Sequence, residues 1–552
     1  MPSPGFPRLS RSLKSRRQRQ GSASYKAAPQ ADHAIHPERL IDWRRVGVEG
    51  GIPSVPVTVE LRPDDLPVGE DTNAAPAIQR AIDQAPAPGA VLLPEGTFHI
   101  TSGITLRSGV VLRGRGLDKT HLLMKSAGDE PAWGSAAISL RGEWAGDERR
   151  ILAGYDAGSR VLVLESADDI SPGQMVYINS ENDMEAMYGT ATYDGHSADW
   201  MAAGESYARR TVHQVLRVLE VRGDTVVLDA PVRLSRMHLD PRLRPMDTIE
   251  WAGVESLHIR LVDPASNSVI AIGRAENCWV RDCELEYAHR THISLGQSRF
   301  ITVESNYIHH AHGYGGGGRG YGVVNGNDCL IWNNVFRMLR HAMLLSNGAN
   351  GSVWAFNYSR EQHQDGRHRL RDISVHGHYP YMTLFEGNVA EFATSSDWWG
   401  SAGPLITFFR NRFDTTLNHS PDPGGWNPPL QIMNGSHRQN VVGNSMISGQ
   451  GIDVKDDSRD ALVEGNLIEG RIVWNEAVHE VLPVSLFLEG PPHFWGDVPW
   501  PAIGADVDAA NAPAYLPIPA QVWGERILSE GRAIPFSAAV PTSPVAPSET
   551  LD

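Results

Sequence analysis

The sequence predicts an all-β protein: a right-handed parallel β-helix, which is a single-stranded solenoid, with an N-terminal capping helix and an inserted β subdomain. Three observations carry this prediction. An asparagine motif recurs along the second half of the chain, short apolar strands alternate with turn residues, and one amphipathic helix precedes the first strands. A chain of 552 residues has ample material for a large core.

The first element is a helix over residues 72–85. The apolar residues of TNAAPAIQRAIDQA recur at helical spacing, and Thr72 or Asn73 supplies an N-cap. The short strands AVLLPEGTFHI, GITLRSG and VVLRGRG follow, separated by Gly and Pro. A helix in this position covers the open end of a β-stack, where an edge strand would otherwise be exposed.

Residues 159–235 form a different β unit. RVLVLES pairs naturally with QMVYINS, and HQVLRVLEV pairs with TVVLDAPV. The intervening stretch 181–210 is rich in Met, Tyr, Trp and Gly, and a loop of that length is usually functional or disordered. We expect either a loop beside a binding face or a structural excursion.

From residue 251 onward the chain repeats an apolar-x-x-Asn-x-apolar unit. Cys283 fills the Asn slot one unit before the first Asn, and the successive intervals from it are 23, 28, 23, 31, 23, 33 and 22 residues. Each unit is too small to bury its apolar face alone, so neighbouring units must stack. Equivalent Asn amides then form a hydrogen-bonded ladder with a spacing of ~4.8 Å. The repeated residues are Asn306, Asn334, Asn357, Asn388, Asn411, Asn444 and Asn466.

Other repeat folds fit less well. Leucine-rich repeats require L-x-x-L-x-L, and propeller blades require ~40–50 residues. The expected organisation is therefore as follows: a disordered basic N-terminus (1–36), an N-terminal cap with the first coils (37–130), the inserted β subdomain (131–250), Asn-ladder coils with the active cleft (251–475), a C-terminal cap over the last coil (476–534) and a flexible tail (535–552).

Two parts of the chain resemble the pectate lyase superfamily, of the rhamnogalacturonase/epimerase-like type. Residues 61–124 match its N-terminal segment through Asp71-Thr72, AIQRAID, LLPEGTF and VLRGRG, and the coils of 251–475 match its Asn ladder. The superfamily includes lyases, hydrolases, epimerases and phage depolymerases, so the resemblance implies carbohydrate chemistry without fixing the reaction. It also implies an extracellular or periplasmic location, although residues 1–32 lack the apolar core of a secretory signal.

The charge distribution limits the partners. The net charge is −16, and residues 1–32 carry seven basic residues against Asp32, so the remaining chain is near −22. Such an acidic body excludes general nucleic-acid binding, and no apolar run is long enough to span a membrane. Three cysteines without paired spacing indicate no zinc site. We expect no metal site and no required cofactor, and leave calcium and the oligomeric state open.

An anionic polysaccharide, the expected partner, would need basic residues gathered in one place. Residues 289–378 hold ten of the 22 histidines. Six residues beyond successive ladder positions lie His289, His312, Arg340 and His363, and one residue further lie Arg290 and His341. We expect these side chains to form a column across consecutive coils, with neighbours ~5 Å apart.

The candidate site is wider than the column. The predicted catalytic residues are His289, Arg290, His292, His312, Arg340, His341, His363, His376 and Asp397. The predicted substrate-binding residues are His378, Arg319, Asp372, Arg410, Trp398 and Trp399. The glycine-rich stretch HGYGGGGRGYG (312–322) is interpreted as a flexible flap.

Two enzyme chemistries fit these residues. In a lyase, His341 or His289 would remove the proton α to a uronate carboxylate, while Arg290 or Arg340 neutralises that carboxylate. A hydrolase would need two carboxylates across the bond, drawn from Asp365, Asp372 and Asp397, with Glu386 a weaker candidate.

The sequence favours a polysaccharide lyase that acts by β-elimination at uronic acid residues. The histidine column favours an enzyme over a non-catalytic adhesin or tail-fibre-like protein, and the lack of an obvious carboxylate pair favours a lyase over a glycoside hydrolase. A uronan C5-epimerase begins with the same proton abstraction and stays an open alternative.

Overall fold

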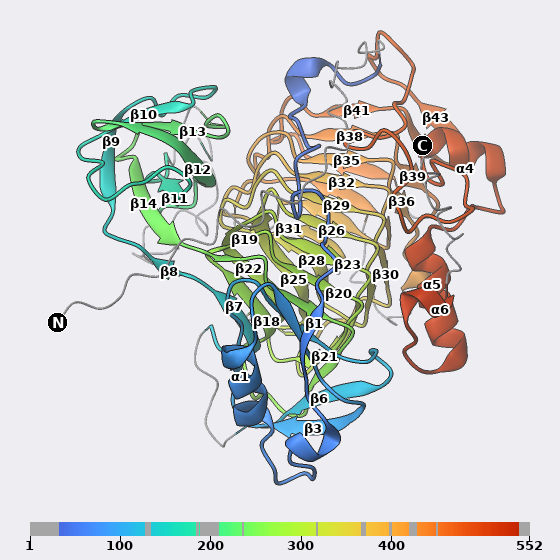
Figure 1. Cartoon of the computed structure of the whole chain (residues 1–552). Helices are drawn as coiled ribbons and strands as arrows, with labels where there is room; N and C mark the ends of the chain where they lie inside the picture. Colours follow the sequence, from blue (N-terminus) through green and yellow to red (C-terminus); the bar gives the residue numbers. More distant parts are fainter. Residues whose placement is uncertain are drawn as a thin grey trace, which may run out of the picture.

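The computed structural model describes residues 33–126, 134–183, 187, 209–234, 237–315, 318–365, 371–396, 400–418, 428–448 and 451–539. The chain winds into stacked coils whose strands form three long, mostly parallel sheets (Figure 1). The predicted right-handed parallel β-helix is confirmed. We call the sheets A, B and C, in the order in which each coil visits them.

Sheets A and B have 12 strands each. Sheet A contains β1 (Val57–Glu60), β2 (Gly89–Leu92), β5 (Val110–Arg113), β16 (Gly253–Glu255), β20 (Trp279–Arg281), β23 (Thr302–Glu304), β26 (Leu330–Trp332), β29 (Val353–Ala355), β32 (Leu384–Glu386), β35 (Thr407–Phe409), β38 (Asn440–Val442) and β41 (Leu462–Glu464). Sheet B contains β3 (Gly96–Ile100), β6 (Thr120–Met124), β17 (His258–Leu261), β21 (Glu284–Ala288), β24 (Tyr307–Ala311), β27 (Val335–Arg337), β30 (Tyr358–Arg360), β33 (Val389–Ala390), β36 (Arg412–Phe413), β39 (Ser445–Met446), β42 (Asn466–Ile468) and β43 (Arg471–Val473).

Sheet C carries the longest coil strands. It contains β4 (Ile104–Thr105), β7 (Ala136–Arg141), β15 (Ile249–Glu250), β18 (Ser268–Gly273), β19 (Ala275–Glu276), β22 (Thr291–Arg299), β25 (Tyr321–Asn327), β28 (His341–Leu345), β31 (Ile373–Val375), β34 (Ala393–Ser395), β37 (Leu430–Ile432) and β40 (Ile452–Val454). The interior between the three sheets is filled by aliphatic and aromatic side chains, and Phe385 stacks on Phe408 with ring centroids 5.3 Å apart. Stacked aromatic rings in successive coils keep the core continuous along the axis.

The predicted Asn ladder is confirmed. Each side-chain amide donates to the Oδ1 of the next ladder Asn, as from Asn357 to Asn388 (2.9 Å) and from Asn388 to Asn411 (2.9 Å). The same Oδ1 accepts the backbone N–H of the preceding ladder residue, so the backbone of Asn357 donates to Asn388 at 3.0 Å. The ladder runs unbroken from Asn306 to Asn466.

The ladder lies at a sharp bend between sheets A and B. The residue before each ladder Asn has a positive φ, for example 56° at Phe356 and 67° at Gly387. A left-handed conformation is unfavourable for a residue with a side chain, by roughly 1–2 kcal/mol. The hydrogen bonds of the neighbouring Asn must therefore stabilise the bend wherever glycine is not used.

A helix covers the first coils, as predicted for residues 72–85. Helix α1 (Ala75–Gln84) buries Ile78 and Ile82 against the open end of the stack. Asn73 supports its start, because its Oδ1 accepts the backbone N–H of Ala75 at 3.1 Å. The short 3₁₀ helix η4 (Pro63–Asp65) precedes it.

Residues 33–56 form an extended strap that the sequence does not predict. It begins near the last coils and runs along sheet A to β1 (Figure 1), passing the short 3₁₀ helix η3 (Pro37–Arg39). Trp43 Nε1 donates to the carbonyl of Met382 at 3.1 Å, and the backbone N–H of Gly47 donates to the carbonyl of Asp328 at 2.9 Å. Residues 33–36 of the segment expected to be disordered are thus ordered, and residues 1–32 lie outside the described residues.

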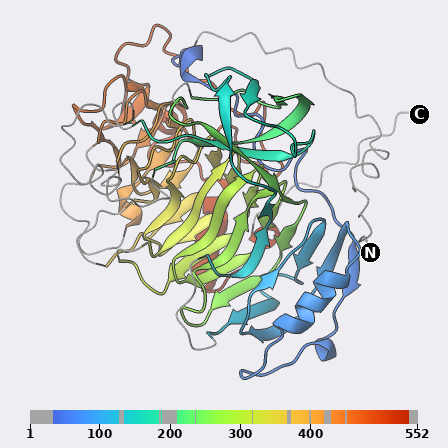
Figure 2. The ribbon, with the colours of Figure 1, turned by 90° about the vertical axis from the view of Figure 1, so that its left-hand side faces the viewer.

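The inserted subdomain is a seven-stranded sheet between β7 and β15. Its strands are β8 (Glu143–Trp144), β9 (Arg149–Ala153), β10 (Val161–Leu164), β11 (Met175–Asn179), β12 (His213–Arg222), β13 (Thr225–Leu228) and β14 (Arg242–Asp247). The predicted pairing of β12 with β13 is confirmed, whereas the predicted pairing of β10 with β11 is wrong, because β10 pairs with β9 and β13. It lies on the sheet C side of the coils (Figures 1 and 2). The carbonyl of His213 fixes it there by accepting from Asn350 Nδ2 (3.0 Å) and Tyr381 O–H (2.5 Å).

The C-terminal segment runs back along sheet B, although the sequence indicated a cover for the last coil. Helix α5 (Pro519–Glu530) packs on β27 and β30, and α4 (Ala505–Asn511) packs on β42 and β43. Helix α6 (Phe536–Ala539) continues into the range expected to be a flexible tail, because Phe536 packs on Trp523 with ring centroids 5.6 Å apart. Among the described helices, none is long and apolar enough to cross a membrane. Residues 540–552 lie outside the described residues.

We predict that Asn388→Ala lowers the free energy of unfolding by about 4 kcal/mol, because it leaves several buried ladder groups without hydrogen-bond partners. Guanidinium unfolding followed by circular dichroism measures the effect. The matched control is Asn511→Ala on helix α4, whose amide is half-buried, and it should lower the free energy by less than about 1 kcal/mol. If the two substitutions lower the free energy of unfolding equally, the ladder hydrogen bonds contribute no more to stability than a surface hydrogen bond.

Candidate functional site

Polar side chains converge where four strands of sheet C begin. In the register of the sheet, Thr291 of β22 lies beside Tyr321 of β25, and Tyr321 lies beside His341 of β28. We define the Arg–His cluster as Arg290, Arg319, Tyr321, Arg340, His341, Arg371 and His376. Six of these residues lie at the starts of neighbouring strands of one sheet, whereas His376 follows the end of β31 and joins them through its ring. Together the seven residues span 87 positions of sequence (376 − 290, counted inclusively).

Three rings form the centre of the Arg–His cluster. The Tyr321 ring lies 5.4 Å from that of His341 and 6.2 Å from that of His376, and the two histidine rings are 5.7 Å apart. Tyr321 and His341 are buried, whereas His376 is half-buried. Tyr321 was not among the residues predicted from the sequence. Its place two residues before VVN, at the start of β25 and in the same register position as His341, is the signal that could have found it.

A hydrogen bond defines the tautomer of the neutral His341 ring. Its Nδ1 lies 2.9 Å from the carbonyl oxygen of Arg371, which can only accept. Nδ1 therefore carries the proton in the neutral ring, and the lone pair is on Nε2. An imidazole held in this way has one nitrogen suited to accept a proton.

Arginines surround the rings. The Arg340 guanidinium lies 5.9 Å from the Tyr321 ring centre and donates from Nη1 to the carbonyl of Gly315 at 2.9 Å. Its buried Nε finds no hydrogen-bond partner among the described residues. Burial lowers the pKa of Arg290, and the neighbouring positive charge of Arg319 lowers it further. Two like charges this close favour the binding of an anion, which would relieve their repulsion.

The described residues of the glycine-rich flap contact this edge of the sheet. The backbone N–H of Tyr314 donates to Asp365 Oδ2 at 3.1 Å, and the Tyr314 ring packs edge-on against His363 at 4.5 Å. Gly320 has a φ of 75°, and a Cβ there would lie 3.1 Å from Cβ of Arg340. The flap thus needs glycine where it passes Arg340. Its motion as a lid stays a prediction.

The predicted column is present in the backbone but not in the side chains. The backbone N–H of His312 donates to the carbonyl of Ala288 (3.0 Å), and that of His363 donates to the carbonyl of Leu339 (2.9 Å), so neighbouring coils have the expected register. His312, however, turns away from the cluster, and its Nε2 contacts the carbonyl of Leu261 at 2.9 Å. His363 contacts the flap instead.

Other predicted residues lie elsewhere. His292 is buried in the core, where its ring contacts the carbonyls of Tyr321 and His309 and burial lowers its pKa to about 4. Arg410 is buried under the C-terminal segment and is ion-paired with Asp506 at 2.6 Å. His289 is buried between β21 and β22, at the bend from sheet B to sheet C, and His378 is buried after β31, at the bend from sheet C to sheet A. Asp397, Trp398 and Trp399 lie outside the described residues.

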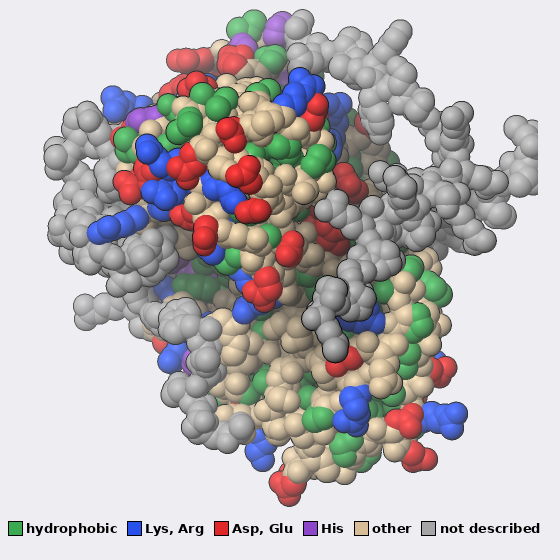
Figure 3. Space-filling view, turned by 60° about the vertical axis from the view of Figure 1, so that its left-hand side comes forward, with side chains coloured by type: hydrophobic (Ala, Val, Ile, Leu, Met, Phe, Trp, Pro, Cys, Tyr) green, Lys and Arg blue, Asp and Glu red, His purple; other side chains and the backbone are tan. Residues whose placement is uncertain are grey.

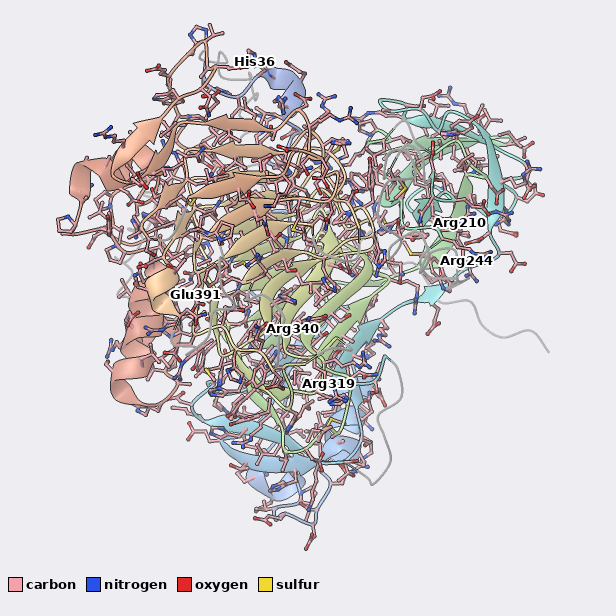
Figure 4. The ribbon with its side chains drawn as sticks, turned by 180° about the vertical axis from the view of Figure 1, so that it is seen from behind. His36, Arg210, Arg244, Arg319, Arg340 and Glu391 are labelled. Carbon is pink, nitrogen blue, oxygen red and sulfur yellow. The ribbon has the colours of Figure 1, made fainter. Side chains whose placement is uncertain are left out.

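A pair of buried carboxyl groups lies behind the Arg–His cluster. Asp372 Oδ2 accepts the backbone N–H groups of Glu391 (3.1 Å) and Phe392 (2.8 Å), and Glu391 accepts from Asn418 Nδ2 at 2.6 Å. Burial raises the pKa of Asp372 to about 6, and burial together with the Asp372 charge raises the pKa of Glu391. Glu391, labelled in Figure 4, was missed because no sequence repeat marks it.

Glu386, the weaker hydrolase candidate, lies on sheet A rather than beside the Arg–His cluster. It is buried under the C-terminal segment, accepts the backbone N–H of Leu486 at 2.9 Å, and has its pKa raised by burial to about 7. Among the described residues, no group of three or more His, Cys, Asp or Glu side chains could hold a metal ion.

Figure 4 shows Arg319 and Arg340 over the coils, apart from Arg210 and Arg244 on the inserted subdomain. Figure 3 shows acidic and basic side chains interspersed on the surface of that subdomain. The Arg–His cluster is therefore a local concentration of positive charge on a protein whose net charge is −16.

Comparisons with known proteins agree with the fold. A family model described as rhamnogalacturonase A/epimerase, pectate lyase-like, matches residues 65–147. The chain thus has the pectate lyase-like β-helix that its sequence resembles. In sequence, no curated protein matches it.

Solved structures similar to this chain include two phage tailspikes and an enzyme. The tailspike gp61 of Pseudomonas phage phi297 is 14% identical over 71% of this chain and 62% of its own, with a TM-score of 0.50. The tailspike gp49 of Pseudomonas phage LKA1 is 14% identical over 71% of each chain, with a TM-score of 0.45. DFA-IIIase of Arthrobacter chlorophenolicus A6, bound to DFA-III, is 10% identical over 74% of this chain and 84% of its own, with a TM-score of 0.41.

The likeness to gp61 shows the fold and leaves the reaction to be argued from the residues. The chain spans 62% of the length of the first of these tailspikes.

We predict that Asp372→Asn changes the pH dependence of stability. The folded state raises the pKa of Asp372 from 3.8 to about 6, so the protonated form is favoured and stability falls as pH rises through the range between these two values. The amide keeps the acceptor without the charge. Relative to the wild type, Asp372→Asn should therefore gain on the order of 1–3 kcal/mol between pH 4 and about 7.

Denaturant unfolding at several pH values measures this difference. Asp83→Asn, at an exposed position of helix α1, is the control. Its free energy of unfolding should change with pH in the same way as that of the wild type. If the pH dependence of Asp372→Asn also matches that of the wild type, ionisation of Asp372 does not destabilise the folded protein. That result would contradict the expected effect of burial on this carboxyl group.

Proposed function

We propose that this protein is a polysaccharide lyase that acts outside the cytoplasm, binds an anionic polysaccharide at the Arg–His cluster and cleaves it by β-elimination at uronic acid residues. The single observation that carries the proposal is the convergence of Arg290, Arg319 and Arg340 on the Tyr321–His341–His376 rings. An arginine group of this kind suits a carboxylate-bearing sugar. The resemblance to pectate lyase-like proteins supports the location and the substrate class.

The reaction begins with removal of the proton α to the uronate carboxylate. We assign this step to His341, since Nδ1 is held by the Arg371 carbonyl and Nε2 keeps the lone pair. The electron pair of the broken C–H bond forms the new carbon–carbon double bond as the glycosidic C–O bond breaks. The leaving oxygen takes a proton from His376, whose ring is 5.7 Å from that of His341 and is half-buried.

Arginine side chains would favour removal of the α proton by stabilising the charge that this step creates. Negative charge builds up on the carboxylate as the α proton leaves, and a positive group already in position stabilises it without reorganisation. We assign this role to Arg340, because its buried Nε has no partner among the described residues, and to Arg290 beside it. Arg319 reaches the same place from the flap, so closing of the flap would complete the binding site.

A glycoside hydrolase is the second candidate, supported by Asp365. This carboxylate is exposed beside the flap, with Oδ1 3.9 Å from His363 Nε2. Asp372 and Glu391 are less suitable, since both are buried and their oxygens accept hydrogen bonds from the fold itself. Proton transfer without cleavage would instead indicate a C5-epimerase, and binding alone would indicate an adhesin.

A panel of uronate-containing and neutral polysaccharides, with and without calcium, tests the reaction class. Ultraviolet absorbance and reducing ends should rise together on a uronate polymer, because elimination creates an unsaturated uronate at each cut. Reducing ends without absorbance would contradict elimination and indicate hydrolysis. Calcium in the assay shows whether the ion contributes.

Substitutions at the cluster test the assignment of residues. His341→Ala should lower kcat by about 10²–10⁴-fold, the usual contribution of a general base. Arg340→Ala should lower it by about 10²–10³-fold through loss of charge stabilisation. His238→Asn, an exposed histidine on the inserted subdomain, is the control and should retain activity. Full activity in both cluster variants would place the site elsewhere.

A further inference from the structure

A cavity lies at the other end of sheet C, where three segments of the chain meet. Its volume is about 300 Å³, and its walls come from the strap, the inserted subdomain and the coils. Arg45 of the strap, Arg160 and Arg233 of the subdomain, and Arg299 of the coils all line it. Ligand cavities begin near this size, and one of ~300 Å³ suits a single small molecule.

Two of the four arginines are neutralised inside the protein. Arg299 is buried and pairs with Asp229 at 2.6 Å and with Asp328 at 2.9 Å. Arg233 pairs with the other oxygen of Asp328 and donates to Asn350 Oδ1 at 2.5 Å. Two arginines thus balance two aspartates, and this network joins the subdomain to the coils.

The acidic residue of the strap is neutralised as well. Asp42, the second aspartate that lines the cavity, receives two hydrogen bonds from Arg44, at 2.7 and 2.9 Å. The hydrogen bond to Arg44 lowers the pKa of Asp42 against the opposing effect of burial. Both side chains are therefore ionised, and their charges sum to zero.

The other two arginines that line the cavity, Arg45 and Arg160, are not neutralised by a buried aspartate. Arg160 donates from Nη1 to the backbone carbonyl of Asp229 at 2.7 Å, and it makes no ion pair with any residue in the described part of the chain. Arg45 has only Glu49 at 3.7 Å, and both of these side chains are more than half exposed, where such a pair contributes little. The cavity therefore carries one arginine without an ion pair in the described part of the chain, Arg160, and a second, Arg45, whose only ion pair is long and exposed.

We propose that this cavity binds a small anion with the size of one sugar ring, whose carboxylate or sulfate group is held by Arg45 and Arg160. Guanidinium groups match the planar carboxylate and the sulfate through paired hydrogen bonds. The neutral network of Arg233, Arg299 and the two aspartates would form a rigid floor beneath the ligand. The ligand would connect the strap to the subdomain.

The cavity is separate from the Arg–His cluster. Arg299 ends β22 and Thr291 begins it, so the cavity and the Arg–His cluster lie at opposite ends of a strand of nine residues. Binding in the cavity can therefore be measured without turnover, so failure of this proposal and failure of the proposed reaction are distinguishable.

Calorimetric titration of the full chain with sodium glucuronate, sodium sulfate and glucose, at constant ionic strength, tests the proposal. Glucuronate should bind saturably at one site, and glucose should not bind. Tighter binding of glucuronate than of sulfate would identify an acidic sugar, and the reverse order would identify a free inorganic anion. Equal binding of glucose and glucuronate, or no saturable binding of either anion, would overturn the proposal.

Variants locate the bound anion. Arg45→Gln and Arg160→Gln should each weaken binding at least tenfold, and Arg44→Gln should also weaken it by leaving Asp42 uncompensated. Arg222→Gln, an exposed arginine on the same subdomain, is the matched control and should bind as the wild type. If Arg340→Ala abolishes binding while Arg45→Gln and Arg160→Gln do not, the anion binds at the Arg–His cluster and the cavity proposal is wrong.

Discussion

The ladder of asparagine amides is the interaction on which the rest of the molecule depends. Each amide links one coil to the next and also accepts a backbone N–H at the bend between sheets A and B. The bend uses a positive φ, which is unfavourable for residues such as Phe356 without such support. Every coil makes this bend at the equivalent position. The strands that follow it in sheets B and C are therefore aligned from coil to coil, and the insertions lie in the loops between strands.

This common register makes the candidate site. The starts of β22, β25 and β28 align Thr291, Tyr321 and His341, and the longer insertion before β25 becomes the flap that passes Arg340. The largest insertion, between β7 and β15, becomes the subdomain that docks at the far end of the same sheet through the carbonyl of His213. One sheet thus carries the Arg–His cluster at one end and the arginine-lined cavity at the other.

The elements that follow a repeated sequence pattern could be predicted from the sequence, whereas those held by contacts between distant segments could not. The fold, the ladder and the helix over Ile78 and Ile82 follow from local periodicity, which depends on spacing alone. The strap of residues 33–56 and helix α5 pack on residues that are distant in the sequence, and no local pattern marks such contacts. The histidine column has the right register, yet His312 and His363 turn away from the cluster. Spacing fixes the backbone, whereas the direction of a side chain at a corner depends on the insertion beside it.

The central claim is that cleavage proceeds by removal of a carbon-bound proton, with His341 as the base. Cleavage of an active uronate polymer in oxygen-18-labelled water, followed by mass spectrometry of the products, tests this claim most directly. Elimination uses no water, so the account predicts unsaturated products without the label. The reducing ends are reduced with borohydride as the reaction is stopped, because a free reducing end slowly exchanges its oxygen with water. One labelled oxygen for each cleaved bond would show that water attacks the bond, and would contradict the account.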